Sequence, residues 1–468
     1  MRTQTRREFL KTVGAAAAFS VSARVVRVGK AMGLSPGRRP PNILFFFPDQ
    51  HRFDWLGTNR NLPVRTPNLD RLSKEGARFT RAFCPSPLCA PSRACLASGK
   101  EYDRCRVKNN GYDYPLDQPT FYKMLRDSGY HVAGVGKFDL HKKTRDWGLD
   151  GSRLLKEWGF SEGIDNAGKW DAIRSGAESP KDPYMVYLHR HGLAEVHVAD
   201  YAKRRSYAAT FPTPLPEDAY CDNWVGNNGV QLLRKFPKDK PWFLMVNFVG
   251  PHNPMDVTER MHKRWQGIDF PQPNDSKQFD ADAHVKIRQN YSAMVENIDR
   301  WLGIYIQEVE KRGGLDNTLI VYSSDHGEML GDHNRWAKGV PYQPSVCVPL
   351  VVWGTDVAGG VVSDGLVSTM DLTATFLDFA RIPVPAEMDS RSLKSLLAGE
   401  TKAHREYVFS GLNDWRMVFD GRYKLVQTEG KRPVLYDLVS DPLENEDIAD
   451  RSSKHVERLA KLLLTRSE

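Results

Sequence analysis

The chain has 468 residues, of which 40% are hydrophobic and 26% are charged. These proportions are those of an ordinary globular protein, which excludes intrinsic disorder and fibrous repeats. The length suffices for one large domain with a smaller one, or for two comparable domains. The net charge of +8 is mild, and no basic run is interleaved with aromatic residues. We therefore predict no nucleic-acid partner and favour an anionic small molecule or polysaccharide.

Residues 1–23 differ in character from the rest of the chain. Arg6 and Arg7 precede Phe9, Leu10 and a short apolar run at 12–21, which ends near small residues. This run is too short to span a bilayer, so no membrane span is predicted. The pattern resembles a twin-arginine export signal, with an ordinary secretory signal or an amphipathic helix as alternatives. We expect a bacterial periplasmic or secreted protein.

Two apolar runs of strand length end in polar groups that can bind a metal. The run "NILFFFPDQ" ends at Asp49 and Gln50, and "TLIVYSSDHGE" continues into Asp325 and His326. In an open α/β sheet, ligands gather at the carboxyl ends of the strands, so these residues are expected to meet there. Their hard oxygens suit calcium or magnesium, and the imidazole adds a preference for manganese. Calcium is the first choice.

Between these runs, helical and strand patterns alternate. Helices are expected at 66–79 and 291–313, and strands at 131–138 and 242–250. After about residue 385 the chain changes to short β-rich segments separated by turns, at 406–411, 415–421, 423–430 and 434–438, before an amphipathic helix at 453–464. We predict an α/β catalytic domain at 40–385 and a C-terminal β-rich subdomain at 386–468.

The cysteines raise a question of role. The chain has six: Cys84, Cys89, Cys95, Cys105, Cys221 and Cys347. No pair has the CxxC spacing of a zinc site or redox motif, and the even count leaves some disulfide bridging open. Pro91 suits the first turn of a helix, which would place Cys89 at a helix N-terminus, where anions are favoured. Arg93 would share its helical face and can pair with a sulfate.

Several motifs, in order, resemble the type I sulfatases. They include "NILFFFPDQ", "CAPSRACLASG", "GYHVAGVGK", "PWFLMVNFVGPHNP", "VYSSDHGEMLGDH" and "KGVPYQPSVCVPL". The resemblance covers nearly the whole chain. It implies an alkaline-phosphatase-like α/β fold, with a large mixed sheet flanked by helices and a small C-terminal antiparallel sheet.

The resemblance also implies a mechanism. Cys89 of "CAPSR" would be converted to formylglycine by a maturation enzyme. The hydrated aldehyde is a geminal diol, of which one hydroxyl attacks sulfur and the other later expels sulfate. The implied metal ligands are Asp49, Gln50, the modified Cys89, Asp325 and His326. The pairs Asp-Gln and Asp-His are found in choline-sulfatase-like and phosphonate-hydrolase-like branches.

Further positions carry over from the family. Lys137 and Lys338 match lysines that hold sulfate oxygens, and His252 matches a histidine near the leaving oxygen. Where relatives read "GKWH", this chain reads "GKFDLH". If the backbone there is extended, Lys137, Asp139 and His141 project to one face, and His141 or Asp139 replaces the usual histidine. The alternative is that Asp139 only pairs with Lys137 and His141 is solvated.

The sequence therefore predicts an exported sulfuric-ester hydrolase acting on an anionic sulfated small molecule or oligosaccharide. Two alternatives stay open. One is a phosphonate monoester or phosphodiester hydrolase of the same superfamily, and the other is an inactive carbohydrate-binding relative.

Overall fold

The computed structural model describes residues 39–465, so the predicted export signal lies outside the described residues. Across this range, no helix has both the length and the apolar character needed to cross a membrane.

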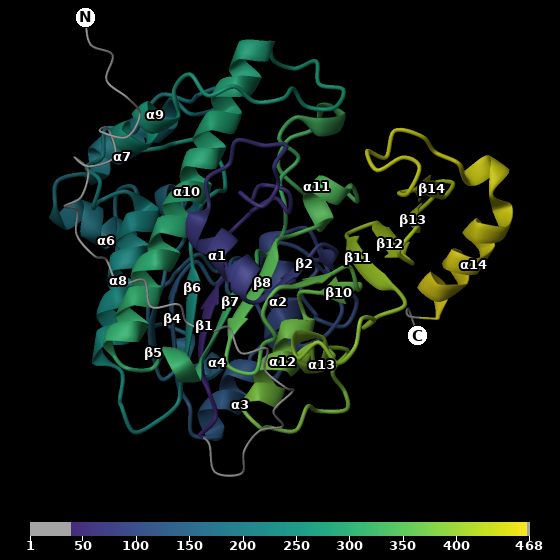
Figure 1. The fold of residues 1–468 in the computed structure, drawn as a ribbon. Helices are drawn as coiled ribbons and strands as arrows, with labels where there is room; N and C mark the ends of the chain where they lie inside the picture. Colours follow the sequence, from purple (N-terminus) through teal and green to yellow (C-terminus); the bar gives the residue numbers. More distant parts are fainter. Residues whose placement is uncertain (1–38, 466–468) are drawn as a thin grey trace, which may run out of the picture. The chain divides into compact units, whose positions relative to one another are not determined.

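A mixed sheet forms the centre of the described chain (Figure 1). Its eight strands run in the order β5-β4-β6-β1-β7-β8-β2-β9. The central strand β1 pairs in parallel with β6 and with β7, whereas β8 runs antiparallel to β7 and to β2. In sheet order, the strands are Glu162–Asp165, His131–Gly136, Trp242–Asn247, Asn42–Phe46, Thr318–Tyr322, Leu350–Gly354, Ala77–Phe79 and Val361–Ser363.

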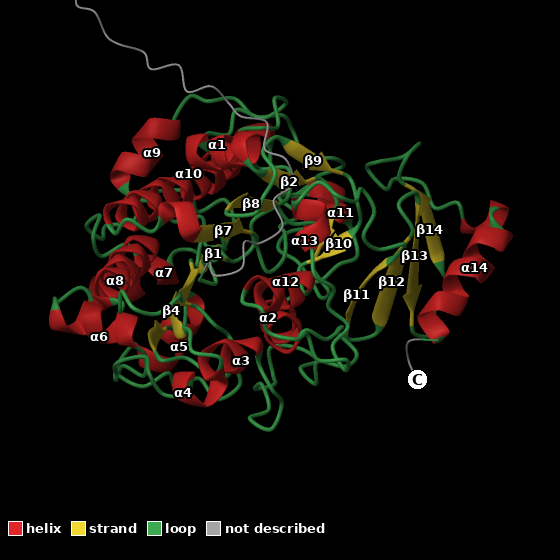
Figure 2. Ribbon diagram, turned by 60° about the horizontal axis from the view of Figure 1, so that its bottom comes forward, coloured by secondary structure: helices red, strands yellow, loops and turns green. Residues whose placement is uncertain are grey.

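The sheet is buried on both faces, which explains the continuous apolar runs of its inner strands. Successive residues of β1 alternate between two cores: Ile43 and Phe45 belong to one, Leu44 and Phe46 to the other. On the first face lie α2 (Cys89–Ser98), α3 (Phe121–Asp127) and α12 (Asp371–Phe379). On the second lie α1 (Pro67–Glu75), α8 (Cys221–Lys235) and α10 (Ala281–Lys311), an arrangement visible in Figure 2.

Two predicted helices have different bounds in the structure. The helix expected at 66–79 ends at Glu75, because Gly76 interrupts it and Ala77–Phe79 forms β2. The helix expected at 291–313 begins earlier, at Ala281, where the Asp280 side chain caps the helix by accepting from the Ala283 amide at 2.8 Å. The remaining helices are shorter: Leu155–Trp158 (α4), Trp170–Gly176 (α5), Pro183–Arg190 (α6), Ala194–Ala202 (α7), Glu259–Trp265 (α9), Gln343–Val346 (α11) and Lys394–Leu397 (α13).

The C-terminal region is the antiparallel sheet with a helix that the sequence predicts. Its strands are β11 (Val408–Leu412), β12 (Trp415–Phe419), β13 (Tyr423–Thr428) and β14 (Val434–Asp437), and α14 (Ser453–Leu464) packs on them. β12 also shares the core of the main sheet, since the ring of Phe419 lies 5.4 Å from that of Phe83. Phe83 belongs to β3 (Ala82–Phe83), which pairs with β10 (Val367–Ser368).

Candidate active site

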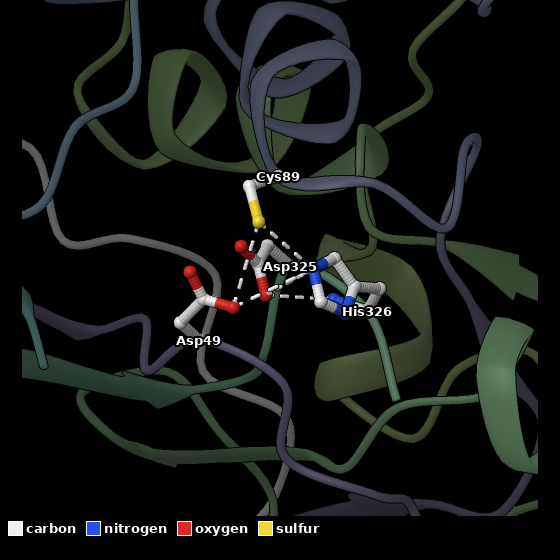
Figure 3. A group of neighbouring side chains, drawn as sticks. All are labelled: Asp49, Cys89, Asp325 and His326. Atoms are coloured by element: carbon white, nitrogen blue, oxygen red, sulfur yellow. Dashed lines mark hydrogen bonds and ion pairs between the residues drawn. The ribbon is translucent and has the colours of Figure 1, made fainter. Parts of the chain in front are cut away.

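The carboxyl ends of the central strands bring the predicted ligands together. Asp49 and Gln50 follow β1, and Asp325 and His326 follow β7. Asp49, Cys89, Asp325 and His326 each offer a ligand atom, and these atoms all lie within 4.8 Å of one another. Figure 3 shows the four side chains pointing toward one another. Residues far apart in the sequence thus form one buried cluster.

Cys89 is the first residue of α2, as the position of Pro91 indicates. Its thiol is 1% exposed, and Sγ lies 3.3 Å from His326 Nε2 and 3.7 Å from Asp49 Oδ1. Burial and the carboxylate of Asp49 act to raise the pKa of the Cys89 thiol, but Lys137 and nearby cations outweigh them and lower it. The environment therefore favours an anionic group at position 89.

Arg93 lies on the same helix and is held by hydrogen bonds from three directions. Nε donates to Asp325 Oδ2 at 3.0 Å, and Nη1 donates to Asn247 Oδ1 at 2.9 Å and to the Lys137 carbonyl at 2.6 Å. Its Nη2, buried as well, has no hydrogen-bond partner within residues 39–465. Nη2 lies 4.0 Å from Asp49 Oδ2. Arg93 is thus fixed in place, with the two N–H groups of Nη2 available to a ligand.

Two lysines flank Asp49. Lys137 Nζ donates to Asp49 Oδ2, and Lys338 Nζ lies 3.8 Å from Asp49 Oδ1. Burial acts to raise the pKa of Asp49, yet Lys137 and Lys338 hold it well below its usual range. The carboxylate is therefore ionised and surrounded by positive charge, which suits an anionic ligand beside it.

The clustered donor set fits a divalent cation. Two buried carboxylates and an imidazole converge next to position 89, and ionised carboxylates are the ligands that hard divalent cations prefer. Gln50 is oriented differently. Its amide oxygen accepts from Lys338 and its amide nitrogen donates to Glu328, while its backbone N–H donates to Asp325 Oδ1 at 3.0 Å. Its role as a metal ligand stays a prediction.

His252 follows β6 and lies near Asp49 and Lys338. Burial and the charge of Lys338 lower the pKa of His252 well below its usual value. The ring is thus neutral at pH 7, and Nδ1 shares a hydrogen bond of 2.5 Å with the Asn253 carbonyl. A bound sulfate would add negative charge and favour the protonated ring, so its predicted role as an acid depends on the substrate.

The segment after Lys137 does not have the extended backbone considered from the sequence. Asp139 has a φ of 54°, and the chain turns at Leu140. As a result, Asp139 and His141 do not share one face. Asp139 Oδ2 lies 3.0 Å from Lys137 Nζ and 2.7 Å from Lys142 Nζ. His141 is 1% exposed rather than solvated, with its ring between those of Trp147 and Trp158 and Nε2 at 3.2 Å from Asp165 Oδ2.

Four further residues, which the sequence does not single out, hold this site together. Lys142 pairs with Asp139. Asn247 accepts a hydrogen bond from Arg93, and Glu328 accepts one from Gln50. Lys169 Nζ donates to the His252 carbonyl at 2.9 Å and pairs with Asp256 at 2.6 Å. Asn247 could have been found, because it is a polar residue at the end of an apolar strand, like Asp49. The other three have no such signal.

The six cysteines are all free and buried, so no disulfide forms between them. The bridging that the even count left open is absent from the described structure.

Comparisons with known proteins bear on the class of enzyme. Residues 41–382 match the family described as Sulfatase, and residues 331–467 match the family described as N-sulphoglucosamine sulphohydrolase, C-terminal. The chain is 26% identical over 463 residues to an arylsulfatase of Clostridium perfringens, which covers 92% of this chain and 94% of the relative. It is 26% identical over 412 residues to an N-acetylglucosamine-6-O-sulfatase of Bacteroides thetaiotaomicron, a match that covers 78% of this chain and 72% of the relative.

A solved structure is similar over the same range. The phosphonate monoester hydrolase of Agrobacterium radiobacter superposes with a TM-score of 0.76 at 23% identity, covering 91% of this chain and 95% of that one. The fold is thus the alkaline-phosphatase-like α/β fold expected from the sequence. The chain belongs to the sulfatase family. It is an enzyme, a sulfuric-ester hydrolase.

Proposed function

We propose that the protein removes sulfate from a sulfated carbohydrate. The reaction would use a formylglycine, made from Cys89, and one bound divalent cation, for which Ca²⁺ is the first choice. The observation that carries the proposal is the position of Cys89. The residue begins α2 and lies beside the Asp49, Asp325 and His326 ligand atoms. A nucleophile formed there would lie beside the carboxylates that can hold a cation and beside the lysines that can offset the charge of a sulfate ester.

The side chains of the site have distinct tasks in this reaction. Asp49, Asp325 and His326 would hold the cation, which supplies Lewis-acid activation of the nucleophile and the sulfate. Arg93, Lys137 and Lys338 would bind sulfate oxygens and offset their charge. His252 would deliver a proton to the leaving oxygen once the anionic substrate has raised its pKa.

The carbohydrate part of the proposal is supported by the sugar sulfatase among the relatives and by the net positive charge of the chain. Export through the twin-arginine signal at 1–23 would place the enzyme where extracellular polysaccharide fragments occur. Maturation requires a formylglycine-generating enzyme as a partner. Substitution of Cys89 by Ala is expected to abolish turnover with little loss of stability, because one small side chain is removed at the site.

The test compares two substrates on one preparation. Protein from a host with the maturation machinery is expected to yield a Cys89 peptide carrying an aldehyde in place of the thiol, and to cleave an aryl sulfate faster than the matching aryl phosphonate. The reverse preference would identify a phosphonate hydrolase. Sugar binding with an intact thiol and no turnover would identify an inactive relative.

Metal removal gives a second test. Chelation is expected to abolish turnover and lower the melting temperature, because a ligand bound only by the native state stabilises that state. Asp325→Ala should lose the metal, measured as bound equivalents per chain. The matched control is Asp332→Ala, which removes a buried carboxylate paired with Arg52 at 2.6 Å, outside the ligand cluster. This control should lose stability but keep the metal; equal metal content in the two variants would contradict the ligand assignment.

A further inference from the structure

A cavity of about 230 Å³ lies beside the active site. Its walls come from the start of α5, the segment after α7 and the segment after His252. The residues that matter here are Trp170, Arg174, Arg204, Arg205, Tyr207 and Asn253.

Two hydrogen bonds tie the walls of this cavity to the catalytic residues. Tyr207 Oη donates to Glu328 Oε2 at 3.2 Å, and the same carboxylate oxygen accepts from Gln50. Lys169, which precedes the lining residue Trp170, donates to the carbonyl of His252, and His252 precedes the lining residue Asn253. A substrate with its sulfate at Cys89 could therefore extend into the cavity.

The cavity is positively charged. Its lining includes three arginines and no acidic residue. Arg204 is already used, because its side chain is buried and makes two hydrogen bonds to Asp200, at 2.8 and 3.0 Å. Arg174 lies 3.4 Å from Asp171, but that carboxylate also pairs with Lys142 at 3.2 Å. The positive charge of Arg174 is thus only partly offset by Asp171.

Arg205 differs from both. It is exposed and forms no ion pair with any residue in the range 39–465. Its guanidinium carbon lies 5.9 Å from the centre of the Trp170 ring, which places a planar cation next to an aromatic face. A guanidinium binds carboxylate and sulfate groups through paired hydrogen bonds, and an aromatic face packs against the apolar side of a sugar ring.

We propose that this cavity binds a second anionic group on the substrate, either a carboxylate or an additional sulfate, with Arg205 as its main ligand and Arg174 beside it. The inference rests on the proposed function and narrows it. The preferred substrate is a saccharide with two or more negative charges, one of them on the ester that is cleaved.

The test measures selectivity. Each sulfated hexose is assayed next to two counterparts that carry the same ester, one with a second sulfate and one linked to a uronic acid. Selectivity is the kcat/KM of a counterpart with the second negative group divided by the kcat/KM of the sulfated hexose. Arg205→Gln is expected to lower this ratio by about 10- to 100-fold, the size of a lost charge-assisted hydrogen bond. Comparison of the two counterparts shows whether the second group is a sulfate or a carboxylate.

Lys203→Gln is the matched control. Lys203 is an exposed cation two positions away, at the C-cap of α7, and is not among the described residues that line the cavity. This variant should keep the wild-type ratio. A ratio in Arg205→Gln equal to that of the wild type, or an equal fall in both variants, would overturn the proposal.

Binding separates this inference from the proposed function. Calorimetry on Cys89→Ala needs no turnover, and adding Arg205→Gln should weaken binding of the anionic counterparts by the same 10- to 100-fold. Such a loss supports the anion site even if the wild-type protein proves to cleave phosphonates. If the wild type cleaves sulfated hexoses but Arg205→Gln leaves binding unchanged, the anion site is wrong and the proposed function stands.

Discussion

At the scale of single residues, Asp139 determines how two lysines of the active site are held. An aspartate with positive φ lies between Lys137 and Lys142 and carries the negative charge that both lysines face. Burial acts to raise the pKa of Asp139, but Lys137 and Lys142 hold it below its usual range. The aspartate is therefore ionised, and it sets the position of the lysine expected to bind sulfate.

We expect Asp139→Asn to lower kcat by about a hundredfold, the size of a lost or misplaced charge-stabilising donor, because Lys137 loses the carboxylate that positions it. The variant should also cost about 3 kcal/mol of stability, because the carboxylate is buried and paired with two lysines. His141→Ala is the matched variant. It removes a ring packed between two tryptophans, so it should cost about 1–3 kcal/mol of stability and leave most of the turnover. Rates and melting curves of the two purified variants check this. Slow turnover in a stable His141→Ala protein would instead assign the role to the histidine.

At the scale of elements, one buried ion pair joins α12 to the chain leading into β11. Asp371, the first residue of α12, accepts from Arg405 Nε at 2.7 Å and lies 3.1 Å from His404 Nε2. The carboxylate also accepts from the Ser368 and Arg391 amides. Burial acts to raise the pKa of Asp371, but Arg405 lowers it below its usual value. The pair therefore connects the C-terminal region to the catalytic core.

The stability that Asp371 contributes should depend on pH. Because its folded pKa lies below the unfolded value of about 4, the contribution is complete at pH 7 and is lost as the pH falls below about 4. Asp371→Asn should cost about 3 kcal/mol at pH 7 and progressively less in acid. Urea unfolding at pH 7, 4 and 3 measures this difference.

Asp378→Asn serves as the control on the same helix. Its carboxylate pairs with a partly exposed Lys394 at 3.0 Å, so the cost should stay within about 1 kcal/mol. A cost for Asp371→Asn that does not change with pH would show that the ion pair is not the source of the stability.

At the scale of the whole molecule, residues after 385 complete the apolar core on the first face of the main sheet. Leu393, Leu397 and Met417 are 0% exposed and belong to the same apolar cluster as Ile43 of β1. The predicted boundary near residue 385 marks a change of sequence pattern, while this core continues across it.

We therefore expect a chain ending at residue 385 to lack cooperative unfolding, because removal of the C-terminal segments exposes the apolar surface of the first face. Near-ultraviolet circular dichroism and a thermal melt of the truncated chain test this. A native spectrum with an unchanged melting temperature would show that residues 40–385 fold alone, as an independent domain.

Much of this architecture could be predicted from the sequence. Buried strands read as apolar runs and end in polar residues, so the sheet and the meeting of Asp49 with Asp325 follow from local patterns. The turn at Asp139 could not be predicted, because neither glycine nor proline lies at it. In the folded protein, the Asp139 carboxylate pairs with Lys137 and Lys142. Nor could Glu328 or Lys169 be assigned, since their partners lie far away in the sequence.

The pairing of β1 with β6 and β7 has a consequence for how the protein is made. Ile43 pairs with Phe243, and Asn42 pairs with Thr318. A growing chain therefore releases "NILFF" from the ribosome long before either neighbour exists, and this strand waits for about 200 residues with its apolar faces and backbone unpaired. Such a segment is open to aggregation, so we expect binding by a chaperone during synthesis. The proposed metal ligands Asp325 and His326 follow β7, so the proposed site can assemble only after that strand has joined β1, and metal uptake would report that step.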